Sequence, residues 1–205
     1  MIDISLPYTA LRSDVAFLRI KQWVFRKHPG VPSDIWIVAF FIHALFSIFV
    51  LLPGFTQFFR RFLWTRLHRV MGAIYIATVL VISAPSGFIM GLVANGGLIS
   101  IISFCTLAVL WWYFTFTAYR AIQKRNFERH AKFMYRSFAL SLSALTLRSW
   151  KWLMINTGLA KTFDWGPMDV YIIAGIMGWT VNLLVAEILI KKKKHLKMLG
   201  SSSTG

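Results

Sequence analysis

Long apolar runs alternate with short polar and basic segments along this chain. Five runs reach the length of about 20 residues that a helix needs to cross the hydrocarbon core of a bilayer. They lie at residues 34–52, 70–93, 98–119, 133–155 and 168–190. The pattern predicts an all-α fold, a polytopic membrane helix bundle of about five transmembrane helices that occupies residues 34–190.

Turn residues mark the ends and the irregularities of these runs. Residues 32–34 (PSD) precede the first run, and Pro53-Gly54 follows it, as helix start and stop signals. Pro85 lies inside the second run and predicts a kink, because proline supplies no backbone amide. Residues 95–97 (NGG) predict a tight turn between the second and third runs.

The two ends of the chain differ from the predicted bundle. Residues 11–27 place apolar side chains on one helical face among Arg and Lys, which is typical of a helix lying on a membrane surface. Packing of this segment against the bundle or a partner is the open alternative. We therefore assign residues 1–33 to an N-terminal interfacial segment, and residues 191–205 to a basic tail with a linker-like end.

Composition supports a membrane protein. The chain is 57% hydrophobic and only 15% charged, which is unlike a soluble domain. The net charge of +16 comes from basic clusters between apolar runs, a distribution that suits anionic lipid headgroups better than nucleic acid. The single cysteine, Cys105, excludes an internal disulfide and a Cys-rich metal site.

The basic clusters also predict the orientation. Most of them lie in the loop at residues 53–69, in the segment at 120–136 and in the tail from residue 191. Five crossings put these three regions on one side of the membrane, and the positive-inside rule makes that side the cytoplasm. We expect a multi-pass protein of the cytoplasmic membrane, with the N-terminus outside and the C-terminus in the cytoplasm.

Polar side chains within or beside apolar spans are the candidates for function, because they are costly there and usually face a partner inside the bundle. At a rise of about 1.5 Å per residue, His68 and His130 lie at similar depth near the cytoplasmic boundary. Arg136 and Glu187 lie close to the same level, so the four residues are predicted to form one polar cluster. The whole set is His43, Gln57, His68, His130, Arg136, Arg148, Asn182 and Glu187.

Two histidines at matching depth on different helices are what axial ligation of a haem b requires. His68 and His130 would supply the ligands, and Gly72 would let the flat macrocycle approach the backbone. Arg69 and Arg129, with two neighbouring arginines, would hold the propionates. Alternatively, each of these histidines binds a headgroup phosphate, a backbone carbonyl or a carboxylate.

The other polar residues have structural and functional interpretations. His43 is a further candidate metal ligand, proton carrier or quinone contact, although a hydrogen-bonded core histidine is favoured. Glu187 paired with Arg136 or Arg129 is interpreted as an ion pair rather than as a proton relay. Arg148 is interpreted as an anchor to the outer headgroups.

Signatures of several enzyme classes are absent from the sequence. It has no phosphate-binding glycine loop, nucleophile elbow or His-Glu-x-x-His zinc motif, so no catalytic residue is assigned. The leading hypothesis is a redox-associated membrane protein that binds haem or another metal and works with a quinone or a membrane redox partner. Its rival is a non-enzymatic subunit, a small-solute or proton carrier, or an assembly factor that uses the same polar cluster. A homo-oligomer and a hetero-oligomer both remain open.

The order of several short motifs resembles the family of predicted membrane proteins known as domain of unknown function 2306. The motifs lie at residues 41–43 (FIH), 52–58 (LPGFTQF), 67–75 (LHRVMGAIY), 83–87 (SAPSG), 129–137 (RHAKFMYRS), 145–148 (LTLR) and 179–187 (WTVNLLVAE). The resemblance covers residues 36–188. It implies an architecture and singles out the polar residues above, with Arg69 among them, but it implies no activity.

The chain has a looser likeness to transmembrane b-type cytochromes, which place histidines on neighbouring helices. It departs from them because it lacks two histidines on one helix separated by about thirteen residues. The likeness therefore implies at most one haem, near the cytoplasmic side.

Overall fold

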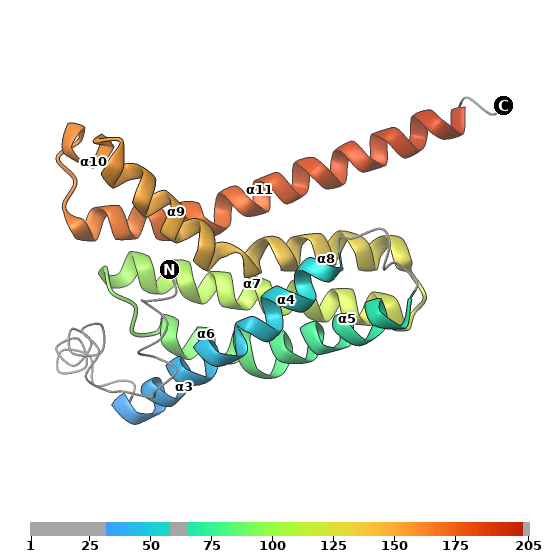
Figure 1. The fold of residues 1–205 in the computed structure, drawn as a ribbon, viewed down its shortest axis with the longest axis horizontal. Helices are drawn as coiled ribbons and strands as arrows, with labels where there is room; N and C mark the ends of the chain where they lie inside the picture. The colour runs from blue at the N-terminus through green and yellow to red at the C-terminus, as the bar shows by residue number, and fades with distance from the viewer. Residues whose placement is uncertain (1–31, 58–64, 203–205) are drawn as a thin grey trace. The chain divides into compact units, whose positions relative to one another are not determined.

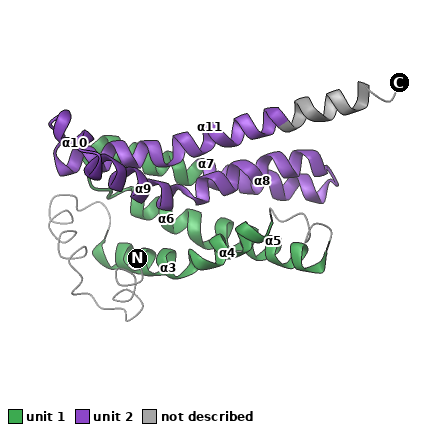
Figure 2. Ribbon diagram, turned by 45° about the horizontal axis from the view of Figure 1, so that its top comes forward, with its two compact units in different colours: residues 1–109 green, residues 110–205 purple. Residues whose placement is uncertain are grey.

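The computed structural model describes residues 32–57 and 65–202, with side chains as far as Lys192. All regular structure in these residues is helical, which confirms the predicted all-α class. The chain divides into two compact units, residues 1–109 and residues 110–205 (Figure 2). The predicted interfacial helix at residues 11–27 lies outside the described residues.

The first unit is built from two long helical segments and the start of a third. α3 (Ser33–Phe46) and α4 (Ile48–Thr56) form the first segment, with Ser47 between them. The stop predicted at Pro53-Gly54 is wrong, because both residues lie inside α4, which ends at Thr56. The second segment consists of α5 (Arg66–Thr78), the π-helical turn η2 (Val79–Ser83) and α6 (Ala84–Gly91). α3 packs on η2 and α6 while α4 packs on α5, so the two segments are antiparallel (Figure 1).

Trp36 is the centre of the buried contacts at one end of this unit. Its side chain is 1% exposed and packs with Val93 and a group of partly buried apolar residues. The indole ring stacks on Phe40 at 5.4 Å between centroids, and Nε1 donates to the carbonyl oxygen of Met90 at 3.4 Å. The polar tip of the ring therefore has a partner inside an apolar environment.

A π-helical turn lies just before Pro85, where the sequence predicts a kink. The amide of Ala84 donates to the carbonyl oxygen of Val79, five residues back, instead of four. A π-turn widens the helix and changes which backbone carbonyls are paired along it. The predicted turn after α6 is confirmed, because Gly96 and Gly97 have φ of 93° and 71°, which glycine adopts without strain.

α7 (Gly97–Gln123) continues from the first unit into the second. The second unit then contains α8 (Phe127–Ser141), α9 (Ser143–Asn156), the short α10 (Leu159–Thr162) and α11 (Pro167–Ser202). α11 packs along both α8 and α9. It runs through the start of the predicted basic tail, so residues 191–202 continue a helix rather than begin a separate segment.

Four helical segments in the described residues are long and apolar enough to cross a membrane. They are Ser33–Thr56, Arg66–Gly91, Gly97–Gln123 and Pro167–Lys192, and only 17–33% of their apolar windows is buried inside the protein. So much exposed apolar surface is expected of helices that face lipid. They correspond to the first, second, third and fifth predicted spans.

The fourth predicted span, at residues 133–155, is not a single helix. It is divided at Leu142 into α8 and α9, and neither part reaches spanning length by itself. The described residues therefore contain four candidate spans, and the fourth of the five predicted spans consists of two shorter helices.

Candidate functional site: polar side chains within the helical segments

Arg136 and Glu187 join α8 to α11 through a two-pronged ion pair. Nε of Arg136 donates to Oε1 of Glu187 at 2.5 Å, and Nη2 donates to Oε2 at 3.0 Å. The guanidinium also lies 4.9 Å from the ring centroid of Phe133 and 5.9 Å from that of Phe114. This geometry confirms the predicted ion pair and selects Arg136 over Arg129 as its cationic partner.

A second polar junction lies at the division between α8 and α9. Nδ2 of Asn182, on α11, donates to the carbonyl oxygen of Ala139 and to Oγ1 of Thr146, both at 3.0 Å. The Thr146 hydroxyl in turn approaches the carbonyl oxygen of Gly178 at 2.6 Å and donates to it. Asn182 therefore contacts both halves of the divided span, and supplies a donor to a carbonyl of the last turn of α8, where intrahelical partners run out.

Close backbone approach accompanies these hydrogen bonds. A Cβ atom at Gly178 would lie 3.1 Å from Cβ and N of Leu147 and 3.1 Å from the carbonyl oxygen of Ser143. A larger residue at this position would force α9 and α11 apart by a few tenths of an ångström. Small residues at such crossings are characteristic of helices that associate within membranes.

Thr115 and Ser137 connect α7 to α8 in the interior of the second unit. Both side chains are fully buried, and their hydroxyl oxygens are 2.7 Å apart. Thr115 donates to the carbonyl oxygen of Trp111, so it accepts from Ser137. Sequence reasoning missed this pair and Thr146, because hydroxyl residues within apolar runs carry no charge. Their positions inside predicted spans could have identified them, because hydroxyl side chains there form hydrogen bonds between helices.

His130 lies at the first turn of α8 and faces α7. Its Nδ1 is 2.9 Å from the carbonyl oxygen of Ala118, which accepts only, so Nδ1 carries the proton and donates. In the neutral imidazole the lone pair is then on Nε2. A metal-ligating histidine is held in this way, by a carbonyl or carboxylate on its other ring nitrogen.

His43 has the same tautomer in the first unit. Its Nδ1 donates to the carbonyl oxygen of Ser83 at 2.9 Å and also approaches the hydroxyl of Ser86 at 3.1 Å. Gly87 makes room for the ring, because a Cβ atom there would lie 3.2 Å from Cε1 of His43. These contacts give the first span a polar link to the π-helical turn, as expected of a hydrogen-bonded core histidine.

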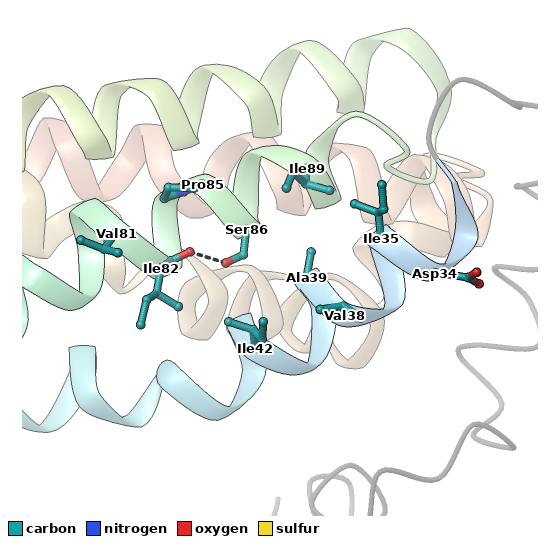
Figure 3. Close-up of a pocket in the computed structure, with 10 residues that line it drawn as sticks. All are labelled: Asp34, Ile35, Val38, Ala39, Ile42, Val81, Ile82, Pro85, Ser86 and Ile89. Atoms are coloured by element: carbon teal, nitrogen blue, oxygen red, sulfur yellow. Dashed lines mark hydrogen bonds between the residues drawn. The ribbon is translucent and has the colours of Figure 1, made fainter.

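An apolar hollow of about 510 Å³ lies beside this link, between α3 and the η2–α6 segment (Figure 3). Aliphatic side chains form most of its wall, and Ser86 provides a hydroxyl that donates to the carbonyl oxygen of Ile82 at 2.6 Å. Asp34 lies at one end of the hollow, at the start of α3. Residues of α3 line one side of the hollow, and residues of η2 and α6 line the other.

Gln57 and His68 form a further contact, between the end of α4 and the start of α5. With the amide nitrogen of Gln57 turned toward His68, it donates to Nδ1 at 2.9 Å, and its oxygen accepts from the amide of Gly72 at 3.3 Å. In the opposite orientation, the amide oxygen of Gln57 would accept a hydrogen bond from a protonated Nδ1 of His68. The tautomer of His68 and the orientation of Gln57 are therefore coupled.

This contact changes the interpretation of Gly72. A Cβ atom there would lie 3.2 Å from Oε1 of Gln57, so the room beside Gly72 is used by this amide in the structure. The sequence predicts that Gly72, one turn after His68, leaves room for a flat macrocycle. In the structure, the side chain of Gln57 lies beside Gly72.

The predicted arginines have local partners or exposed positions. Arg148 donates from Nη1 to the carbonyl oxygen of Ala144 at 2.8 Å, four residues back along its own helix. The guanidinium of Arg129 lies 5.7 Å from the ring centroid of Phe133. Arg69 is exposed in the first turn of α5.

Two residues of the predicted four-residue cluster pair within the second unit. Arg136 and Glu187 pair directly, whereas His130 bonds to Ala118 and His68 contacts Gln57. His68 belongs to the first unit and His130 to the second. Among residues 32–57 and 65–202, no three His, Cys, Asp or Glu side chains converge as a metal site. The predicted histidines therefore form no three-ligand centre in that part of the chain, while axial ligation of a haem needs only two.

Comparison with known proteins places the chain in a family. The model of domain of unknown function 2306, described as a predicted membrane protein, matches residues 40–190. The chain belongs to this family. Neither the curated proteins nor the solved structures contain a significant match.

Membership in domain of unknown function 2306 agrees with the exposed apolar surface of the four spanning segments, and identifies the chain as a membrane protein with several apolar helices. The matched range extends from the first spanning segment to the end of the apolar part of α11. It contains the Arg136–Glu187 pair, the Asn182 junction, the Gln57–His68 contact and the His43 link.

Proposed function

We propose that this membrane protein is redox-associated and holds a single haem b, with His130 and His68 as the axial ligands. The observation that carries the proposal is the hydrogen bond from Nδ1 of His130 to the carbonyl oxygen of Ala118 at 2.9 Å. This bond fixes the ring and leaves the Nε2 lone pair for a ligand. The haem would supply one-electron chemistry, exchanged with a quinone or a membrane redox partner.

The second ligand depends on Gln57. His68 offers an Nε2 lone pair when the amide oxygen of Gln57 accepts from its Nδ1, and no lone pair there when the amide nitrogen donates to Nδ1. Binding of His68 to a haem iron would therefore require the amide oxygen of Gln57 to face Nδ1 of His68. Arg69 and Arg129 adjoin the two histidines in sequence and carry the positive charge that propionates need.

The test is the visible absorption spectrum of the full chain, purified after expression with added haem precursor. We expect a Soret band with one haem per chain, lost in His130→Ala and in His68→Ala. His43→Ala is the matched control, because this histidine also donates from Nδ1 to a carbonyl but is not a proposed ligand. Circular dichroism and gel filtration establish that each variant is folded. A folded wild-type protein with no Soret band would end the haem proposal.

The hydrogen bonds between polar side chains of different helices favour a second candidate function, in which the polar residues only join helices. Asn182 uses both of its amide hydrogens on α8 and α9, and Arg136 is paired through two nitrogens. Such contacts join helices without any ligand, as in a non-enzymatic subunit or an assembly factor. Stoichiometric co-purification of a partner, with tolerance to substitution at His43, His68 and His130, would support this function over haem binding.

A small-solute or proton carrier would instead show flux that changes near pH 6 to 7, where an unperturbed histidine titrates.

The divided α8–α9 segment supports an odd number of crossings. Arg136 meets Glu187 at one end of the contact with α11, and Thr146 meets Gly178 further along, so the two segments are antiparallel. Because α11 is a candidate spanning segment, the α8–α9 segment that packs along it would cross the same thickness of bilayer. An odd number of crossings supports the proposed topology, in which the N-terminus lies outside and the C-terminus lies in the cytoplasm.

Thiol labelling of intact cells tests this topology. In a Cys105→Ser background, Lys161→Cys should react with a membrane-impermeant reagent from outside, whereas Gln123→Cys should react only after the cells are opened. Both positions are exposed, at the opposite ends of the α8–α9 segment. Equal labelling of the two positions in intact cells would show that the divided segment does not cross.

A further inference from the structure

A cationic hollow lies at the hairpin between α7 and α8. The chain reverses direction through Arg125, which has a φ of 55°, and Asn126, whose side chain accepts from the amide of Arg129. The hollow has a volume of about 400 Å³ and is lined by the last turns of α7 and the first turn of α8. All of these residues belong to the second unit.

Three positive side chains line this hollow and no carboxylate does. Arg120, Lys124 and Arg129 contribute the charge, and Asn126 adds a polar group. Glu128 is the nearest acid in sequence, but it pairs with Lys132 at 2.6 Å and is not part of the lining. Lys124 follows directly after α7, and its amide donates to the carbonyl oxygen of Arg120 at 3.3 Å. The two like charges are therefore one helical turn apart, where they repel. An anion bound between them would relieve that repulsion.

The hollow continues into an exposed aromatic stripe on α7. Tyr113 and Phe116 form part of its wall and are 51% and 37% exposed. Trp112 stacks on Phe116 at 5.0 Å between centroids and extends the stripe toward the middle of the span. Trp112 and Arg120 are separated by about 12 Å along the helix, at a rise of about 1.5 Å per residue. A ligand that fits both the basic hollow and the aromatic stripe has an anionic headgroup and an apolar chain.

We infer that this hollow binds the phosphate headgroup of an anionic phospholipid, with an acyl chain lying on the Trp112–Phe116 stripe. The charge selects a headgroup with net negative charge over a zwitterionic one, as at basic pockets on the cytoplasmic side of other membrane proteins. The aromatic wall selects a lipid over free phosphate. The inference needs neither His68 nor His130, so it does not depend on the proposed haem, although Arg129 serves both proposals.

The test is native mass spectrometry of the full chain in detergent, titrated with phosphatidylglycerol, phosphatidylcholine or inorganic phosphate. We expect phosphatidylglycerol to bind the wild type and to bind Arg120→Gln/Lys124→Gln about thirtyfold more weakly, as expected for the loss of two charges near a membrane surface. Lys191→Gln/Lys192→Gln is the matched control, because it removes the same net charge from exposed positions on α11. This control should bind phosphatidylglycerol like the wild type.

Each other outcome overturns the inference. Equal weakening in the two double variants would show that phosphatidylglycerol responds only to the net charge of the chain. Equal binding of phosphatidylcholine and phosphatidylglycerol would show that the cations do not select the headgroup. Binding of inorganic phosphate as tight as that of the lipid would show an anion site with no role for the aromatic stripe. Thermal unfolding curves of the variants establish that they are folded during the titration.

Discussion

Glu187→Leu is expected to lower the free energy of unfolding by about 3 kcal/mol, because it leaves the Arg136 guanidinium without its carboxylate inside a helix pair. The two side chains are only 21% and 33% exposed, so bulk water cannot replace the lost partner fully. The measurement is an unfolding titration of the purified protein in mixed micelles with increasing sodium dodecyl sulfate, followed by circular dichroism.

The double variant Arg136→Met/Glu187→Leu distinguishes the pair from general disruption. Removing both charges also removes the unpaired cation, so stability should return to within about 1 kcal/mol of the wild type. The matched control is Glu128→Gln, which breaks the ion pair with Lys132 one helical turn away at a more exposed position. That change should cost no more than about 0.5 kcal/mol. A double variant as unstable as the sum of its two single variants would show that Arg136 and Glu187 are not coupled.

The positions of the spanning segments were largely predictable from sequence, because burial in lipid requires long apolar runs. The first run, predicted at residues 34–52, is Ser33–Thr56 in the structure, and the last, at 168–190, is Pro167–Lys192. The irregularity at Pro85 was predictable for a local reason, since proline lacks an amide hydrogen wherever it occurs. These features depend on residues that are neighbours in sequence.

The division of the fourth span was not predictable in this way. The segment around Leu142 contains no proline or glycine that would indicate an interruption. The donor that reaches the last turn of α8 comes from Asn182, on a different helix, 43 residues from the carbonyl of Ala139 that it contacts. A break stabilised by a distant side chain leaves no local signal in the sequence.

Depth along a helix was also insufficient to predict which polar groups meet. The rise per residue correctly placed Arg136 and Glu187 at a common level, and they pair. The rise says nothing about rotation around the helix axis, and this rotation directs His130 to the backbone of Ala118. Gln57, which contacts His68, lies in the turn after α4, so no helical period related the two residues.

Gly178→Leu is expected to be the most damaging single substitution in the second unit. The added side chain would begin 3.1 Å from backbone atoms of Ser143 and Leu147, which cannot rotate away as a flexible side chain can. α9 and α11 would have to separate, and the bonds from Thr146 to Gly178 and from Asn182 to Thr146 would be lost with their contact. We expect a loss of more than about 3 kcal/mol for Gly178→Leu, and of about 1–3 kcal/mol for Gly178→Ala, from overpacking.

Val185→Leu is the matched control, because it enlarges a side chain of the same helix that is 49% exposed. Its stability should stay within about 0.5 kcal/mol of the wild type in the same detergent titration. The graded series from Gly to Ala to Leu at position 178 tests close packing directly, since the loss should increase with side-chain volume. Wild-type stability in Gly178→Leu would mean that α9 and α11 do not approach one another closely, and the Asn182 junction between the halves of the divided span would then have no structural basis.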